Sequence, residues 1–217
     1  ERTQARRTTW DYSRNKYDVC EIFSPPRVAA QAAAMGFRGG WSLDKEHDDP
    51  ITLRRYDFRK PEDREMAKRM LKRDRPRLLV LSPPCTAFSQ AQNINGGPTP
   101  EALAEGIELF NFAIELAILQ QRLGGLYVLE NPQTSRAWCL PEIEALIKGT
   151  NCIQADFDMC QYGMMSQDAD GDGLVRKTTG VLCNSWPLAE LIEKRCPGNH
   201  RHVHLVGGDR TSKAAVY

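Results

Sequence analysis

A cysteine that follows two prolines is the residue of this sequence best suited to nucleophilic chemistry. The apolar run Leu78–Leu81 is followed, after one serine, by Pro83 and Pro84, and Cys85 comes next. Because proline cannot donate to a sheet ladder, the run predicts a buried strand that ends there and holds Cys85 on a stiff loop. In open α/β sheets, catalytic and ligand-binding residues lie at the edge formed by the carboxyl ends of the strands. The alternative is a structural cysteine in the core, and the polar side chains between Thr86 and Gln90 argue against it.

A second polar group follows the next predicted strand. The run Leu126–Pro132 ends in Glu130, Asn131 and Pro132. An Asn-Pro pair at the end of a strand usually indicates only a turn. If this strand neighbours the strand before Cys85, however, a carboxylate and a thiol face one another across the carboxyl edge of the sheet.

These two motifs resemble those of the cytosine-C5 DNA methyltransferases, whose catalytic loop reads Pro-Cys-Gln-x-Phe-Ser and whose next strand ends in Glu-Asn-Val. This chain has Pro-Cys-Thr-Ala-Phe-Ser from Pro84 to Ser89 and Glu-Asn-Pro from Glu130. The likeness keeps the same order from Asp18 to about Val216. It looks closest to the divergent versions carried by eukaryotic retroelement polyproteins.

The resemblance implies a covalent mechanism. Cys85 would add to C6 of cytosine and so activate C5 toward the methyl group of S-adenosylmethionine, while Glu130 would hold N3 and the exocyclic amine. The base must leave the stack for this reaction. Ser89 and Gln90 would contact the nucleic acid beside the flipped base. The basic pair Arg176 and Lys177 would contact the target base or its phosphate.

The resemblance also implies a cofactor site. Phe23 and Ser24 occupy the place of the family's Phe-x-Gly-x-Gly loop, Asp44 the place of the acid that binds the ribose, and Asp57 that of the acid that binds the adenine amine. Pro84 would line the same site. Acids at strand ends suit hydroxyl and amine donors. This chain departs from the family in one respect, because its first loop has two prolines and no glycine.

A cluster of metal-binding residue types lies near the end of the chain. Cys196, His200, His202 and His204 fall within nine residues, and Cys183, Cys160 or Cys152 could complete a zinc site. The alternative is a basic loop that touches nucleic-acid phosphate. Three alternating acids, Asp168, Asp170 and Asp172, match the first half of a calcium loop. The twelfth position is a threonine, so a flexible solvated loop is favoured.

Strand and helix patterns alternate along the chain and position these residues. Strands are expected at 17–23, 37–44, 51–58, 78–81, 126–132, 152–157 and 178–184, helices at 28–35, 61–73, 100–123, 140–148 and 186–194, and a loop at 159–173. This alternation predicts an α/β fold with a Rossmann-like, doubly wound and mostly parallel sheet. The resemblance implies the S-adenosylmethionine-dependent methyltransferase type of this sheet.

Composition limits the class of protein. The 217 residues are 41% hydrophobic, and 29 basic and 28 acidic residues give a net charge of +1, so contact with a polyanion must be local. Seven cysteines without a signal peptide or long apolar span indicate an intracellular protein with reduced thiols and no membrane contact. With DNA as substrate, the expected location is the nucleus.

The expected organisation is an arm at 1–16, a catalytic core at 17–185, a small Cys/His-rich segment at 186–210 and the start of a closing helix at 211–217. The segment at 186–210 takes the place of a large target-recognition domain. Three functions are compatible with these features. They are methylation of cytosine in DNA, methylation of cytosine in RNA, and a catalytically silent cofactor-fold module within a larger polyprotein.

Overall fold

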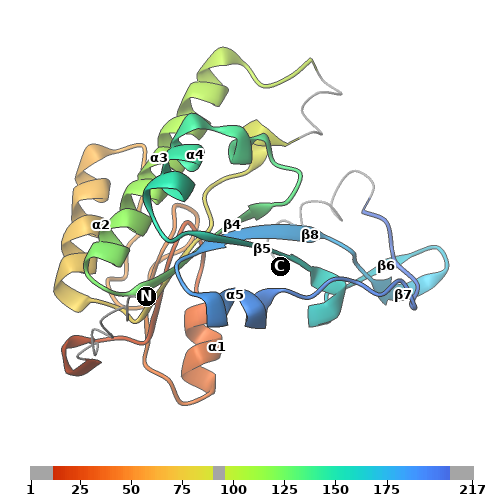
Figure 1. The fold of residues 1–217 in the computed structure, drawn as a ribbon, viewed down its shortest axis with the longest axis horizontal. Coiled ribbons are helices and arrows are strands. Elements are labelled where there is room, and N and C mark those ends of the chain that lie inside the picture. Colours follow the sequence, from red (N-terminus) through yellow and green to blue (C-terminus); the bar gives the residue numbers. More distant parts are fainter. Residues whose placement is uncertain (1–11, 90–95, 206–217) are drawn as a thin grey trace, which may run out of the picture. The chain divides into compact units, whose positions relative to one another are not determined.

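The computed structural model describes residues 12–89 and 96–205 and shows an α/β fold with a six-stranded, mostly parallel sheet (Figure 1). The strand order is β2-β1-β3-β4-β8-β5. Most of the predicted arm, Gln90 and the predicted closing helix at 211–217 lie outside the described residues. The predicted fold class is therefore confirmed at the level of a mostly parallel α/β sheet.

The strands of the sheet are β1 (Val19–Ile22), β2 (Gly39–Leu43), β3 (Leu78–Leu81), β4 (Leu126–Pro132), β5 (Ile153–Asp158) and β8 (Thr178–Cys183). A separate hairpin consists of β6 (Met165–Asp168) and β7 (Gly171–Leu174). The helices are α1 (Val28–Ala34), α2 (Pro61–Asp74), α3 (Pro100–Arg122), α4 (Pro141–Gly149) and α5 (Trp186–Ile192). Short 3₁₀ turns are η1 (Tyr12–Arg14), η2 (Thr86–Phe88), η4 (Arg136–Cys139) and η5 (Met159–Tyr162).

The chain divides into two compact units, and the first comprises residues 1–81 and 115–127. Its strand β1 lies between β2 and β3 and runs parallel to both. The indole Nε1 of the buried Trp41 donates to Oδ2 of Asp74 at 3.1 Å, which joins β2 to the last residue of α2. Helix α1 contacts β1 and β2. Proline at the start of α2, acids in its first turn and bases in its last turn suit the helix dipole, as the sequence predicts.

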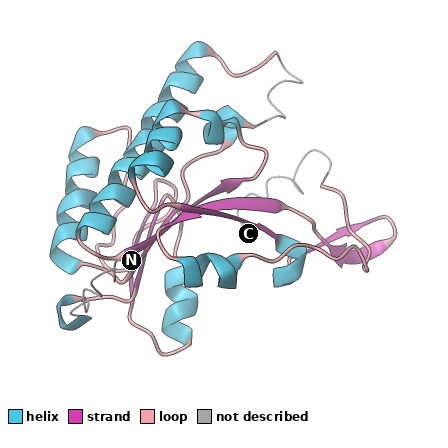
Figure 2. Cartoon of the chain, viewed as in Figure 1, coloured by secondary structure: helices cyan, strands magenta, loops and turns pink. Residues whose placement is uncertain are grey.

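The second unit comprises residues 82–114 and 128–217. Its strand β8 runs antiparallel to β4 on one side and to β5 on the other, so the last strand of the sheet inserts between two earlier strands. In this register the start of β8 lies beside the end of β4, with Thr179 opposite Pro132. Figure 2 shows the β6-β7 hairpin as a separate pair of strands beyond η5.

Two predicted elements are wrong. Residues 51–58 form turns and no strand, because the buried carboxylate of Asp49 accepts hydrogen bonds from the amides of Ser42 and Thr52 and folds this segment back. Residues 159–173 are not a plain loop, because they contain η5 and most of the β6-β7 hairpin. Asp168 is the last residue of β6, Asp170 lies in the hairpin turn, and both pair with Arg201.

None of the helices among the described residues is both long enough and apolar enough to cross a bilayer.

Candidate functional site

The loop that carries Cys85 is held by packing on both sides of the cysteine. Cys85 is half-buried and directly precedes η2, whose Phe88 amide donates to the Cys85 carbonyl at 3.0 Å. The ring of Phe88 is buried and lies edge-on to Phe110 of α3, with ring centroids 5.7 Å apart. A Cβ added to Gly106 of α3 would lie 2.7 Å from the Cβ of Ala87, so α3 and η2 are in close contact. The cysteine therefore has a fixed backbone position.

Asn131 connects the cysteine loop to the end of β4. Its side chain is buried, and its Nδ2 donates to the carbonyl of Pro83 at 2.9 Å. Glu130, the preceding residue on β4, is half-buried. One hydrogen bond thus fixes the two sequence motifs relative to each other within the second unit.

Two charges of opposite sign act on the Cys85 thiol. Burial raises the pKa of this thiol, the ammonium group of Lys177 lowers it, and the carboxylate of Glu130 raises it further. The net result is a thiol pKa above the ordinary value. Lys177 reaches this place because it directly precedes β8, the strand that starts beside the end of β4. The structure thus brings Cys85, Glu130 and Lys177 together.

The other residues that the sequence predicts for this site differ in burial and in their partners. Ser89 is half-buried at the end of η2, and Pro84 is exposed. Arg176 is half exposed, and its Nε lies 3.6 Å from Oδ1 of the fully buried Asp158. Arg176 therefore contributes to an ion pair at the end of β5, while Lys177 is the basic residue that acts on Cys85.

The first unit holds the predicted cofactor residues. Phe23 follows β1 with φ of +65°, a left-handed conformation that is strained for a residue other than glycine. Its amide donates to Leu43 O at 2.9 Å, and its ring lies edge-on to Phe58 at 4.9 Å. Ser24 is buried, and its hydroxyl donates to Glu21 at 3.2 Å. The loop makes its sharp turn without glycine because Phe23 adopts the left-handed conformation.

Glu21 organises this loop and is not singled out by the motif comparison. It is fully buried on β1, and its Oε1 accepts hydrogen bonds from the amides of Arg27 at 2.9 Å and Ala29 at 2.7 Å. These amides lie at the start of α1, where a carboxylate is favourable. The signal in the sequence is a single acid inside the otherwise apolar run of β1.

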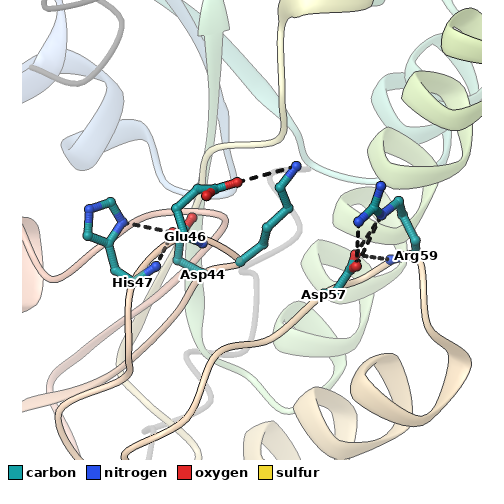
Figure 3. Close-up of polar contacts among 6 residues, drawn as sticks. Asp44, Glu46, His47, Asp57 and Arg59 are labelled. Carbon is teal, nitrogen blue, oxygen red and sulfur yellow. Dashed lines mark hydrogen bonds and ion pairs between the residues drawn. The ribbon is translucent and has the colours of Figure 1, made fainter.

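The carboxylate of Asp44 is partly engaged by its own loop (Figure 3). Its Oδ1 accepts hydrogen bonds from the amides of Glu46 at 2.8 Å and His47 at 3.1 Å, and lies 3.0 Å from Nδ1 of His47. Among the described residues, Oδ2 has no such partner. Asp44 can therefore accept a further donor without losing these contacts.

Asp57 is more fully engaged than Asp44. Arg59 contacts both carboxylate oxygens of Asp57, with its Nε 2.8 Å from Oδ1 and its Nη2 2.6 Å from Oδ2 (Figure 3). The hydrogen bond from the Arg59 side chain lowers the pKa of Asp57 to about 2. The carboxylate is therefore ionised at neutral pH, and an amine donor must compete with Arg59 for it.

The Cys/His residues of the second unit also come together. Cys160, Cys196, His200 and His202 place one ligand atom each within 4.8 Å of the others. Three cysteines could complete the predicted zinc site, and Cys160 is the one whose Sγ lies beside the other ligand atoms. Cys183 is buried and contacts the carbonyl of Ser185, and His204 lies outside the cluster.

Comparison with known proteins gives no relative, because no protein-family model matches the chain and no curated protein matches it significantly.

Proposed function

We propose that this protein transfers a methyl group from S-adenosylmethionine to C5 of cytosine in DNA, through a covalent bond between Cys85 and C6 of a flipped base. The observation that carries the proposal is that Cys85, on a loop that Asn131 fixes to β4, is grouped with Glu130 of β4 and with Lys177, which directly precedes β8. A nucleophile, an acid and a cation at the ends of adjoining segments are what this reaction needs. The six-stranded, mostly parallel sheet is compatible with the methyltransferase type of Rossmann-like fold.

Each residue has a role that follows from its charge. The Cys85 thiol gives up its proton to water and adds as a thiolate to C6, and Lys177 stabilises that thiolate. Glu130 accepts a hydrogen bond from the exocyclic amine of cytosine and shares a proton with N3, which favours the electron-rich ring that the addition creates. When C5 has been methylated and has lost its proton to water, the electron pair of that C–H bond restores the C5–C6 double bond and the thiolate leaves again. Arg176, Ser89 and Gln90 are proposed to contact the nucleic acid around the base.

S-adenosylmethionine would supply an electrophilic methyl group. Among the residues present, Asp44 fits this cofactor best, because its Oδ2 can accept a ribose hydroxyl while Oδ1 keeps its loop contacts. Phe23, which is half-buried and backed by the buried ring of Phe58, offers an apolar face on the same unit. Asp57 fits an amine only in exchange for Arg59.

Two observations favour the silent-module alternative, in which the chain binds its partners within a larger polyprotein and does not catalyse. Asp57 is paired with Arg59, and burial keeps the pKa of the Cys85 thiol high. Both features would reduce activity in the absence of ligands. Nuclear location and membership of a polyprotein are proposals that accompany the DNA substrate.

Transfer of tritiated methyl groups tests the proposal. The chain is incubated with labelled S-adenosylmethionine and with duplex DNA or structured RNA of the same sequence. We expect DNA to be labelled by the wild type and by Cys139→Ala, which removes an exposed cysteine, but not by Cys85→Ala. Labelling of RNA alone would favour the RNA alternative. Undiminished labelling by Cys85→Ala would exclude the covalent mechanism, and no labelling together with no cofactor binding by calorimetry would favour the silent module.

A further inference from the structure

Cys160, Cys196, His200 and His202 place one ligand atom each within 4.8 Å of the others, and the two distances from Cys196 to the histidines are those of a tetrahedral metal site. The Sγ atom of Cys196 lies 3.5 Å from Nε2 of His200 and 3.4 Å from Nε2 of His202. Bonds of about 2.3 Å from zinc to sulfur and about 2.0 Å to nitrogen place such ligand atoms about 3.6 Å apart in a tetrahedron. We propose that these four residues bind one structural zinc ion.

The surrounding polar groups prepare the ligands for a metal. Nδ1 of His200 lies 3.1 Å from Oδ1 of Asn199, so its N–H donates there and leaves the lone pair of Nε2 for the cluster. The amide of Gly198 donates to Sγ of Cys196 at 3.3 Å, which helps to hold the sulfur in place. Gly198 has φ of +74°, and this turn brings its amide to the sulfur. Two thiolates and two imidazoles fill all four positions, as in a structural site.

Among the described residues, the part of the chain around the cluster has a small hydrophobic core. Three buried side chains, Met164, Val175 and Val203, form its hydrophobic core. The hairpin gains a third extended segment, since the amide of Val203 donates to Leu174 O at 2.8 Å. Such small modules usually depend on a metal or a disulfide. A zinc ion would join Cys160, which precedes the hairpin, to the three ligands that follow α5.

The side chain of Asp158 already brings the two halves of the site near each other. The buried carboxylate of Asp158 accepts hydrogen bonds from the Cys196 amide at 2.7 Å and from the Thr178 hydroxyl at 2.5 Å. This contact fixes the start of the Cys196 turn, while the zinc would fix its remaining ligands and the hairpin.

The zinc would also help to position Lys177. The carbonyl of Lys177 accepts a hydrogen bond from the Met159 amide at 3.0 Å, directly before Cys160. Val175, two residues before Lys177, belongs to the small core. This second consequence rests on the proposed function, in which Lys177 stabilises the Cys85 thiolate, whereas the zinc site itself does not.

Metal analysis of the purified full chain tests the site. We expect about one zinc per chain in the wild type and in His204→Ala, whose exposed imidazole lies outside the cluster. We expect His200→Ala/His202→Ala to lose the zinc. Because these variants could unfold, the wild type is also loaded with Co²⁺, which should show the intense visible bands of tetrahedral coordination and a thiolate charge-transfer band.

Three results would overturn the zinc site. These are wild-type protein without metal that keeps full amide protection in β6 and β7, a weak octahedral Co²⁺ spectrum, and a Cys160 to Cys196 disulfide found by non-reducing mass spectrometry. Removal of zinc by a chelator should reduce amide protection in the hairpin and slow the alkylation of Cys85. Zinc with an unchanged alkylation rate would overturn the positioning of Lys177 only, and methyl transfer can fail without affecting the zinc content.

Discussion

The reactivity of Cys85 depends on two neighbouring charges and on burial. Burial and Glu130 raise the pKa of the thiol, and Lys177 lowers it. The nucleophile is therefore mostly protonated at neutral pH in the free protein. A bound base that is held by Glu130 would neutralise part of the carboxylate's effect, so the thiolate would form mainly when substrate is present.

Alkylation of Cys85 by iodoacetamide, followed by peptide mass spectrometry across a pH series, should show this balance. We expect Lys177→Gln to raise the pH midpoint of alkylation, because it removes the cation that favours the thiolate. Glu130→Gln should lower the midpoint, because it removes the anion that opposes it. The exposed Cys139 on the same chain is the internal control, and its alkylation should not change. Identical midpoints in all three proteins would show that these charges do not act on the thiol.

Arg59 competes with any ligand for the carboxylate of Asp57. If the proposed cofactor amine binds Asp57, Arg59→Ala should tighten the binding of S-adenosylmethionine, because the carboxylate no longer has to release the guanidinium group. Asp57→Asn should weaken binding by about tenfold to a hundredfold, since a hydrogen bond to a charged group is worth about 1.5–3 kcal/mol. Isothermal titration calorimetry measures both. Weaker binding by Arg59→Ala would mean that Arg59, and not Asp57, contacts the cofactor.

At the scale of elements, the position of Cys85 depends on the contact between η2 and α3. Gly106 is the residue of α3 that permits this contact, because an added Cβ would lie 2.7 Å from that of Ala87. Alanine is otherwise preferred over glycine in a helix interior by about 1 kcal/mol. The helix preference would stabilise an alanine at position 106, and the close contact would destabilise it. Because neither of the two methyl groups can move away, we expect the close contact to have the larger effect.

We expect Gly106→Ala to lower the free energy of unfolding by about 1–2 kcal/mol, as overpacking does. It should also change the alkylation rate of Cys85. Ala87→Gly in the same chain should restore part of the loss. Gly149→Ala at the end of α4 is the matched control, since an added Cβ there meets nothing within 4 Å and should leave stability unchanged or higher. Urea denaturation measures all four proteins, and a Gly106→Ala variant as stable as the control would refute the close contact.

Local patterns in the sequence predict most of the elements but not how strands pair. The proline breaks at Pro83 and Pro132 mark the ends of β3 and β4 correctly. Thr99 caps α3, because its Oγ1 accepts a hydrogen bond from the Ala102 amide at 3.2 Å. The apolar residues of 51–58 suggest a strand, yet Leu53 is 79% exposed, because the hydrogen bonds that the buried Asp49 accepts from the Ser42 and Thr52 amides turn this segment.

In the candidate site, too, local patterns predict some of the residues, and the pairing of strands decides the others. Cys85 and Glu130 follow from motif and spacing, since each lies directly after or at the end of a predicted strand. The role of Lys177 depends on β8 inserting antiparallel beside β4, which no local pattern encodes. The choice of Cys160 among three cysteines likewise depends on the fold, because the partner ligands lie at least 36 positions further along the chain.

At the scale of the whole molecule, the net charge of the chain provides no general electrostatic attraction for nucleic acid. The 29 basic and 28 acidic residues nearly cancel, and several basic side chains are paired, such as Arg176 with Asp158 and Arg201 with Asp168. Binding of DNA must therefore rely on a few local contacts and on capture of the flipped base. A covalent bond to that base is the most specific consequence of the proposal.

Trapping with 5-fluorocytosine tests that consequence most directly. Fluorine at C5 cannot leave as a cation, so methylation should stop at the stage where Cys85 is still bonded to C6. Duplex DNA that contains this base, incubated with the full chain and S-adenosylmethionine, should give a complex that survives denaturing electrophoresis and maps to the Cys85 peptide. Cys139→Ala should form it and Cys85→Ala should not. A complex of equal yield in Cys85→Ala, or methyl transfer to normal DNA without any trapped complex, would contradict the account.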